Sequence, residues 1–205
     1  MEMTAPKKLQ GWLVLFLVAL VAGLALAATN EMTREPIKQR AIESALAARK
    51  AVFSAADAFE ELPVATDRGV DSFYRALKDG QTIGYEAQST VHGYGGPIEV
   101  IVGMDLDGKL TAISVGGSNF SETAGLGSKA KEPSFKDQFM GISLPAELSG
   151  NVDAISGATI TSRAVVLGVN QAGQYILTSM SDGSLDSAPD AGAGQGGGES
   201  GGTAN

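Results

Sequence analysis

The sequence has no cysteine and a single histidine, and both scarcities restrict its chemistry. Without thiolates, the 205-residue chain forms no disulfide, binds no iron–sulfur cluster through its own side chains and has no cysteine-based zinc site. His92 stands beside the segment GYGGP, where we interpret it as a strand-end or turn residue and not as a metal ligand or a catalytic base. We therefore expect no metal site and no catalytic residue, and any redox function would need an organic cofactor.

Positive charge is also scarce, with 15 lysines and arginines against 23 acidic residues and a formal net charge of −8. Nucleic-acid binding depends on clustered lysine and arginine side chains that neutralise phosphates, so we expect no nucleic-acid partner. A chain of this length, with 43% hydrophobic residues, is expected to form one compact domain with additional tails.

Charged side chains are absent from residues 11–28, GWLVLFLVALVAGLALAA. At a rise of about 1.5 Å per residue, a helix of this length nearly matches the hydrocarbon thickness of a bilayer. The segment predicts a transmembrane helix over residues 11–29. A cleaved signal peptide is the alternative, because Ala25 and Ala27 form a small-residue pattern near the end of the run, but the stretch exceeds the usual length of a secretory apolar region.

Flanking residues predict the orientation of this helix. Lys7 and Lys8 precede the apolar stretch and Trp12 lies where an interfacial aromatic is expected, so the positive-inside rule places residues 1–10 in the cytoplasm. Basic residues between positions 34 and 40 weaken this asymmetry. We expect a single-pass protein of the cell membrane, with everything after the helix on the extracytoplasmic side.

The segment after the apolar stretch predicts a second helical region. Residues 30–63 are expected to form a juxtamembrane helical segment that Pro36 opens and Pro63 ends. Its apolar positions at three- and four-residue spacing are Ile42, Leu46, Val52, Phe53, Ala56 and Phe59.

Two Asp-Gly turns predict a pair of antiparallel hairpins, since this dipeptide accepts the positive backbone angles of tight turns. One turn is Asp79-Gly80 within residues 72–91, and the other is Asp107-Gly108 within residues 97–117. In the second hairpin, alternation assigns one face to Ile98, Val100 and Val102 on the first strand and to Leu110, Ala112 and Ser114 on the next.

Residues 163–180 predict a C-terminal amphipathic helix, whose apolar positions are Val165, Val166, Val169, Ala172, Ile176 and Leu177. Residues 181–205 are rich in glycine, serine and acidic residues, so we expect a disordered tail. Together these elements predict an α+β fold. A single N-terminal transmembrane helix would precede one extracytoplasmic domain, residues 64–180, with an antiparallel sheet and flanking helices.

The segment DAISGATITSRAV, residues 153–165, places four hydroxyls where the last helix begins. In chain order they are Ser156, Thr159, Thr161 and Ser162. A helix N-terminus carries unpaired N–H donors and a positive dipole end, so this is a candidate phosphate site, and Gly157 and Ala158 would let the backbone approach closely. The alternative is that one of the first three hydroxyls only caps the helix.

Four segments of the sequence resemble a known family. DAISGAT at residues 153–159 is similar to the flavinylation motif of the FMN-binding domains found in the G subunit of the Rnf complex and the C subunit of the sodium-pumping NADH:quinone oxidoreductase. GYGGPIEVIVGMDLDGKLTAISV from Gly93, ETAGLG at residues 122–127 and FKDQFMG from Phe135 precede it in the order typical of Rnf G subunits. The resemblance covers roughly residues 5–180, and it is far more specific than any of its motifs alone.

The resemblance implies a covalent cofactor. In this family FMN is joined through its phosphate to a threonine, which corresponds to Thr159 here, and a separate flavin transferase installs it from FAD. Ser156, Thr161 and Ser162 would then donate hydrogen bonds to the phosphate oxygens. Asp153 would belong to the sequence that the transferase recognises, or it would be a turn-forming residue.

The resemblance also implies that the segment ETAGLG lines the flavin ring. Its two glycines would allow backbone approach, its leucine would offer an apolar wall, and its glutamate and threonine would make polar contacts. The commoner family form has proline where Ala124 stands. The implied contact residues are Glu122, Thr123, Gly125, Leu126 and Gly127.

The function implied by the resemblance is electron transfer in an Rnf complex, which moves electrons between ferredoxin and NAD while it translocates sodium ions or protons. The implied partners are the other membrane subunits, the bilayer and the flavin transferase. Two flavoprotein alternatives are a stand-alone membrane-tethered extracytoplasmic flavoprotein and the C subunit of the quinone-reducing complex, whose usual chain has a longer insertion after the anchor. A third alternative is a tethered surface domain with no cofactor.

Overall fold

The computed structural model describes residues 7–64, 69–182 and 185, which divide into two compact units. The first unit runs to Ala48 and the second starts at Arg49. Residues 1–6 of the predicted cytoplasmic segment, and residues 183–184 and 186–205 of the predicted tail, lie outside the described residues. The expectations for these two ends of the chain therefore stay predictions.

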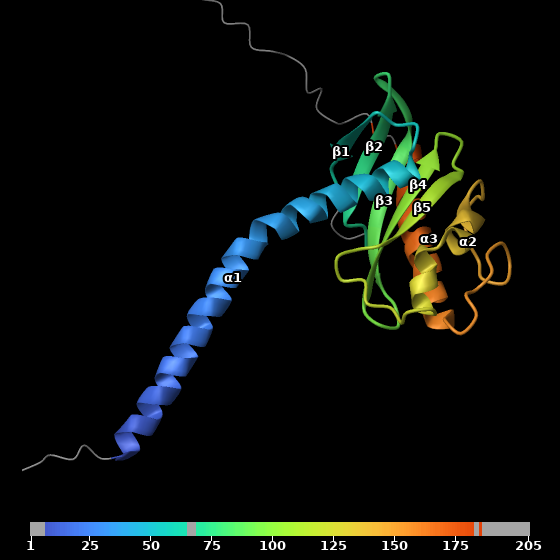
Figure 1. Ribbon diagram of the computed structural model, residues 1–205. Coiled ribbons are helices and arrows are strands. Elements are labelled where there is room, and N and C mark those ends of the chain that lie inside the picture. The colour runs from blue at the N-terminus through green and yellow to red at the C-terminus, as the bar shows by residue number, and fades with distance from the viewer. Residues whose placement is uncertain (1–6, 65–68, 183–184, 186–205) are drawn as a thin grey trace, which may run out of the picture. The chain divides into compact units, whose positions relative to one another are not determined.

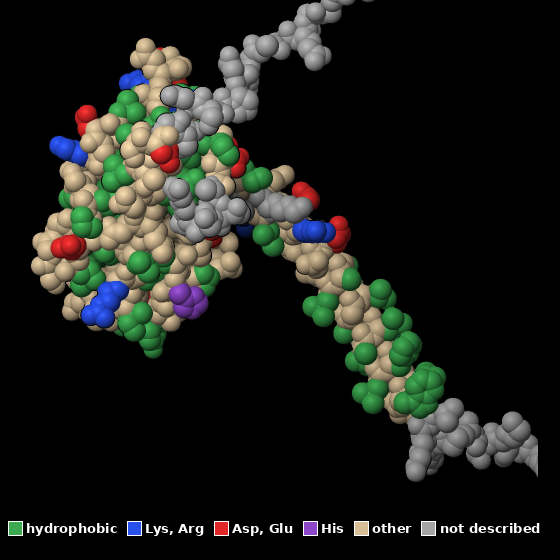
Figure 2. Space-filling model, turned by 180° about the vertical axis from the view of Figure 1, so that it is seen from behind, with side chains coloured by type: hydrophobic (Ala, Val, Ile, Leu, Met, Phe, Trp, Pro, Cys, Tyr) green, Lys and Arg blue, Asp and Glu red, His purple; other side chains and the backbone are tan. Residues whose placement is uncertain are grey.

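One helix, α1 (Lys7–Val52), contains the whole apolar stretch. From Gly11 onward it is long and apolar enough to cross a membrane. Its side chains between positions 11 and 37 are exposed wherever they are described, and Figure 2 shows hydrophobic side chains along this part of the helix. Pro36 lies inside α1 and does not open a helix, because α1 continues on both sides of it. The proline removes one backbone hydrogen bond of the helix.

The end of α1 differs from the expectation. The helix ends at Val52 and not at Pro63, because Ala58–Leu62 form the edge strand β1. This strand pairs with its neighbour in the sheet, so that Phe59 lies opposite Ala76. The backbone N–H and C=O groups of these residues form hydrogen bonds along the sheet edge and not within a helix. The predicted helical position of Phe59 is therefore wrong.

Five antiparallel strands form one sheet in chain order, β1 to β5 (Figure 1). The strands that follow β1 are β2 (Ser72–Lys78), β3 (Gln81–His92), β4 (Pro97–Asp105) and β5 (Leu110–Gly116). Both predicted hairpins are confirmed, since β2 pairs with β3 and β4 pairs with β5. Gly80 and Gly108 have positive φ angles of 75° and 79° in the two turns.

A β-bulge changes which residues of β5 face the core. The pairing of β4 with β5 skips Thr111, which is therefore an extra residue on β5. Beyond the bulge, Ile113 and Val115 are buried in the core, while the predicted Ala112 and Ser114 are only half-buried. The predicted face of β5 is wrong after its first residue. The predicted face of β4 is confirmed, with full burial of Ile98, Val100 and Val102.

The C-terminal helix α3 (Thr159–Ser181) lies along one face of the sheet, over β3 and β4 (Figure 1). Of its predicted apolar positions, Val165, Val166, Val169, Ala172 and Ile176 are buried and Leu177 is half-buried. Gly168 allows this close packing, and its carbonyl accepts a hydrogen bond of 3.0 Å from the buried Ser89 hydroxyl. Three short helices connect β5 to α3, namely η1 (Gly127–Lys131), α2 (Pro133–Lys136) and η2 (Asp137–Phe139).

The last turn of α1 packs on the sheet face opposite α3. Because side chains alternate along a strand, a side chain at Gly84 or Gly103 would point away from the core. A Cβ atom at either glycine would collide with Phe53, so the two glycines form a notch for this turn. Val52 and Phe53 are buried there, and the Thr111 hydroxyl donates a hydrogen bond of 3.2 Å to the Val52 carbonyl oxygen.

Glu86 is a buried carboxyl beside this contact. Its side chain is 2% exposed, and its Oε1 atom lies 3.3 Å from Arg49 Nε. The Arg49 guanidinium also stacks on the ring of Tyr74, 3.4 Å from the ring centroid. Burial raises the pKa of Glu86 to about 7, although the positive charge of Arg49 acts in the opposite direction. The sheet therefore holds an acid that titrates near neutral pH.

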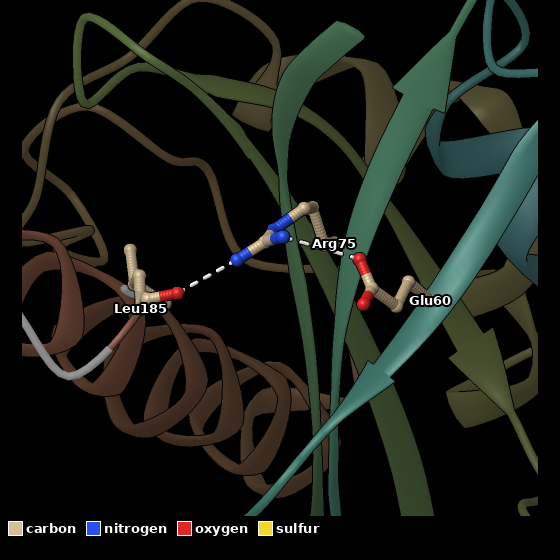
Figure 3. A network of polar contacts seen from close by, with 3 residues as sticks. All are labelled: Glu60, Arg75 and Leu185. Carbon is tan, nitrogen blue, oxygen red and sulfur yellow. Dashed lines mark hydrogen bonds and ion pairs between the residues drawn. The ribbon is translucent and has the colours of Figure 1, made fainter. Parts of the chain in front are cut away.

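Arg75 binds both Glu60 and Leu185. Its Nη1 atom donates to Glu60 Oε2 at 3.1 Å, and its Nη2 atom donates to the Leu185 carbonyl oxygen at 2.7 Å (Figure 3). The Leu185 side chain packs against the core. One guanidinium thus joins the edge strand β1, its neighbour β2 and the end of the described chain.

Replacing Gly103 should show whether the notch is needed. The Cβ atom of Gly103→Ala would collide with Val52 and Phe53, so we expect a loss of about 1–3 kcal/mol in the free energy of unfolding. Gly116→Ala is the matched control, because its Cβ atom would lie an ordinary 3.6 Å from Lys131. Urea unfolding of the full chain in detergent micelles measures both. Equal losses in the two variants would contradict the notch.

Glu86→Gln should remove a pH dependence of stability. A carboxyl whose pKa rises from 4.5 to about 7 on folding binds its proton more tightly in the folded state. Its contribution is therefore fully present below pH 4.5 and is lost as the pH rises through about 7. Relative to Glu86→Gln, the wild-type protein should lose up to about 3 kcal/mol over this window.

Thermal unfolding followed by circular dichroism, in detergent at a series of pH values, measures this difference. Glu61→Gln is the control, because Glu61 is exposed on β1 and its replacement should leave the pH profile unchanged. A wild-type profile parallel to that of Glu86→Gln would show that the Glu86 carboxyl does not titrate near neutral pH.

Candidate functional site

A cleft of about 520 Å³ lies at the start of α3. Three segments far apart in the sequence line it: the β3–β4 turn, the loop before η1, and the residues around the start of α3. The structure thus brings the predicted segments ETAGLG and SGAT together. The lining residues are Tyr94, Glu122, Thr123, Leu126, Gly127, Gly157, Ala158, Thr159, Ile160 and Thr161.

The helix start in this cleft has no side-chain cap among the residues that the structure describes. Ala158 occupies the N-cap position, and it has no side chain that could bond to the first N–H groups of α3. The first backbone N–H groups of a helix have no acceptor within the helix, and here they carry its positive dipole end. Gly157 has a φ of 76°, a backbone conformation that glycine adopts without strain. The cap alternative therefore does not explain the hydroxyl cluster.

Two of the four hydroxyls have partners inside the protein. Thr161 is 1% exposed and donates a hydrogen bond of 2.7 Å to Glu122 Oε2. Ser162 is fully buried; it donates to the Ala158 carbonyl oxygen and accepts from the Ile155 N–H, both at 3.0 Å. A donation from either hydroxyl to a phosphate, as predicted, would require these bonds to break.

The other two hydroxyls are more accessible, but they line different hollows. Thr159 is exposed and lines the cleft. Ser156 lies with Asp153 in a separate pocket of about 170 Å³, which Lys129 and Gln138 also line. Of the four predicted hydroxyls, Thr159 is thus the exposed one that lines the cleft.

The carboxylate of Glu122, which lines the cleft, already has partners within the protein. Its Oε2 atom accepts from Thr161, and its Oε1 atom accepts from the Gly95 N–H at 3.1 Å. Both carboxylate oxygens therefore bind protein groups already, and a direct contact with a ligand would compete with these bonds. The Thr123 carbonyl oxygen accepts backbone N–H bonds from Leu126 and Ser128, both at 3.1 Å, and so shapes the loop.

The two glycines of this loop, Gly125 and Gly127, are needed for different reasons. Gly125 has a φ of 75°, and its N–H donates to the Ser128 hydroxyl at 2.9 Å. It supports the turn but does not line the cleft. Gly127 lines the cleft and is buried, and a Cβ atom there would collide with Glu122 and Thr161. The absence of a side chain at Gly127 therefore serves internal packing, and its predicted contact with a flavin ring stays a prediction.

The cleft has an apolar rim that the sequence did not fully reveal. Tyr94 is 70% exposed, Ile160 is 56% exposed and Leu126 is 42% exposed, and all three line the cleft. The sequence alone assigns no role to Tyr94, because a tyrosine beside a strand needs no ligand. Its position between two glycines, in the sequence Gly93-Tyr94-Gly95, is the signal that could have found it.

The residues present fit a flavin mononucleotide. Among the described residues that line the cleft, Glu122 is the one that carries a charge, so an anion must be held by backbone N–H groups. The uncapped helix start supplies these donors for a phosphate, and the exposed apolar side chains of the rim can pack on a flat aromatic ring.

Comparison with known proteins gives the family. Residues 93–174 match the model of the FMN-binding domain. The chain is 35% identical over 181 residues to the G subunit of the Na(+)-translocating ferredoxin:NAD(+) oxidoreductase complex of Acetobacterium woodii, with 77% of this chain and 86% of that protein covered. It is 31% identical over 171 residues to the G subunit of the proton-translocating complex of Clostridium ljungdahlii, with coverages of 80% and 89%.

Methanosarcina acetivorans also has a similar protein. The G subunit of its ion-translocating oxidoreductase complex is 32% identical over 172 residues, covering 78% of this chain and 89% of that protein. The C subunit of the Na(+)-translocating NADH-quinone reductase from Parabacteroides distasonis, a solved structure, aligns over 54% of this chain and 62% of its own with a TM-score of 0.44 and 24% identity. That likeness is too weak to add to the assignment.

The G-subunit relatives match along most of their length, and the matched FMN-binding region includes both the ETAGLG loop and the start of α3. The expected α+β fold, with its long apolar helix and antiparallel sheet, is confirmed. The chain contains an FMN-binding domain and belongs to the family of G subunits of the Rnf complex, the multi-subunit ion-translocating ferredoxin:NAD oxidoreductase.

Proposed function

We propose that this G subunit carries FMN esterified through its phosphate to Thr159, and that it passes electrons within the Rnf complex. One observation supports Thr159 as the attachment residue. Of the four hydroxyl residues at the start of α3, Thr159 is exposed and lines the cleft, while Thr161 and Ser162 are buried and hydrogen-bonded within the protein and Ser156 lines another pocket.

Attachment would transfer the FMN phosphoryl group from FAD to Thr159. Thr159 Oγ1 would attack the FMN phosphorus of FAD, a bond would form between that oxygen and phosphorus, and the bond to the adenylate would break. AMP leaves, and the hydroxyl proton passes to a base of the flavin transferase. The resulting diester keeps one negative charge, which the N–H groups at the start of α3 can hold without a neighbouring cation.

The chain then binds and orients the cofactor. The helix start would fix the phosphate, while Tyr94, Leu126 and Ile160 would pack against the ring and exclude water from its face. FMN supplies one- and two-electron transfer when it is bound. Covalent attachment keeps the flavin from being lost into a large external volume, which suits a domain outside the cytoplasm.

The membrane orientation is part of the same proposal. The apolar part of α1 would cross the membrane once, with Lys7 and Lys8 on the cytoplasmic side. The domain that follows, residues 64–180, would then carry its cofactor on the extracytoplasmic side. The other membrane subunits of the complex would be its electron donors and acceptors.

Replacement of Thr159 tests the attachment. The full chain, exported and co-expressed with a flavin transferase, should gain one FMN-sized mass, which fluoresces on a denaturing gel. Thr159→Ala should gain none, because no oxygen remains to form the ester. Thr159→Ser should regain the adduct, because it keeps the hydroxyl.

Ser156→Ala is the control for attachment, because Ser156 lines the separate pocket and its loss should leave the adduct in place. An adduct on Thr159→Ala would move the attachment to another residue. Complete absence of an adduct on the wild-type chain, with an active transferase present, would overturn the covalent flavin altogether.

The lack of cysteine offers a test of orientation. Gln81→Cys, at the exposed β2–β3 turn, and Lys8→Cys, before the apolar stretch, would each carry a single thiol. A membrane-impermeant maleimide should label Gln81→Cys in cells with a permeabilised outer layer and an intact inner membrane. Lys8→Cys should be labelled only after lysis. The reverse pattern would place the domain in the cytoplasm.

A further inference from the structure

The carboxylate of Glu122 connects the three segments that form the cleft. It comes from the loop before η1, its Oε1 atom binds the Gly95 N–H of the β3–β4 turn at 3.1 Å, and its Oε2 atom binds the Thr161 hydroxyl in the first turn of α3 at 2.7 Å. A bond to a carboxylate is stronger than one between neutral groups. These two bonds therefore hold together three parts of the chain that are far apart in the sequence.

Three glycines make room for this arrangement. A Cβ atom on Gly93 would collide with Glu122 Oε1, and one on Gly127 would collide with Glu122 Oε2 and approach Thr161 Oγ1. A Cβ atom on Gly95 would collide with the Ser121 carbonyl oxygen. The surrounding backbone is thus shaped to bring a carboxylate against both donors.

The negative charge of Glu122 argues against a role in binding the FMN phosphate directly. An ionised carboxylate near a phosphate repels it, and Glu122 is the one charged side chain among the described residues that line the cleft. A side chain whose only role was to bind an anion would be a hydrogen-bond donor or a cation. The negative charge is tolerated because both oxygens are already bound to donors of the protein.

The bonds of Glu122 also affect two other residues that line the cleft. The bond to Gly95 holds the turn that carries Tyr94, the most exposed side chain of the rim. The bond to Thr161 engages the hydroxyl nearest to Thr159 in the sequence, so that this hydroxyl does not compete for attachment. Both effects favour one geometry for the ring and one hydroxyl for attachment.

We propose that Glu122 is a positioning residue for flavin attachment, acting through Gly95 and Thr161 without contacting the cofactor. This inference rests on the proposed function, because it concerns the same cleft. Glu122 sets the distance between the rim and the start of α3, and it presents Thr159 as the reactive hydroxyl. Misplacement of reacting groups by about 1 Å can cost about a hundredfold in rate.

The test compares Glu122→Ala, Glu122→Gln and Thr161→Val in the full chain, co-expressed with a flavin transferase. The initial rate of FMN incorporation is followed by intact mass and gel fluorescence, and the attachment residue is found by peptide mass mapping. Glu61→Ala is the matched control, because this carboxylate is exposed on β1. Thermal unfolding of each flavin-free variant reports whether the domain is folded.

Glu122→Ala should incorporate FMN at least about tenfold more slowly than wild type, and the visible circular dichroism of the bound flavin should change. Glu122→Gln should stay within about threefold of wild type, because its amide oxygen can accept from Gly95 and its NH₂ group can donate to the Thr161 oxygen. Glu61→Ala should match wild type in both measurements.

Thr161→Val keeps the shape of the side chain and removes only the bond to Oε2, so it probes the inference even where Glu122→Ala does not fold. It should slow incorporation in the same direction. The double variant Glu122→Ala/Thr161→Val should be no slower than the slower single variant, because both changes remove the same interaction.

Wild-type rate and spectrum in folded Glu122→Ala would overturn the positioning role. A loss in Glu122→Gln as large as that in Glu122→Ala would also overturn it, since the charge and not the hydrogen bonds would then matter. A wild-type chain that gains no flavin is a different result, because it overturns the proposed attachment itself together with everything built on it.

Discussion

An FMN phosphate bound at the start of α3, as proposed above, would place an anion in a chain whose net charge is −8. Among the described residues no lysine or arginine lines the cleft, so the attraction would have to come from backbone N–H groups and the helix dipole. That requirement explains several local features together. The N-cap is an alanine that leaves the N–H groups unblocked, a glycine with positive φ precedes it, and the Glu122 carboxylate in the cleft lining accepts hydrogen bonds from two protein donors. A diester at Thr159 would present only one charge to this weak positive field.

The two faces of the sheet have separate tasks. One face packs against α3 and forms the core, which holds the start of that helix in place. The other face receives the last turn of α1 in the notch of Gly84 and Gly103, beside the ion pair of half-buried Arg49 and buried Glu86. Because the strands are shared, the cleft and this contact are supported by the same β3 and β4. A largely buried ion pair of this kind is a weak source of net stability, because removing its charges from water costs free energy.

Local chemistry was enough to predict much of the fold. The Asp-Gly turns give the two hairpins because few other residues adopt positive φ, and the spacing of apolar residues gives the buried side of α3. The segments ETAGLG and SGAT were assigned by resemblance, and the structure brings them into one cleft. Their side-chain roles could not be predicted in the same way. Whether Thr161 faces a ligand or Glu122 depends on a residue 39 positions away, and no local pattern carries that information.

Two errors of sequence interpretation concern residues that meet at Thr111. The end of α1 and the face of β5 were both misplaced, and Thr111 lies where the two meet. The final carbonyl groups of a helix lack partners within the helix. As the extra residue of the bulge, Thr111 turns its hydroxyl toward the outer face and donates to the carbonyl oxygen of Val52, the last residue of α1. A single inserted strand residue thus acts as a C-terminal cap supplied from another element, and deletion of Thr111 would disturb the strand register and the helix end together.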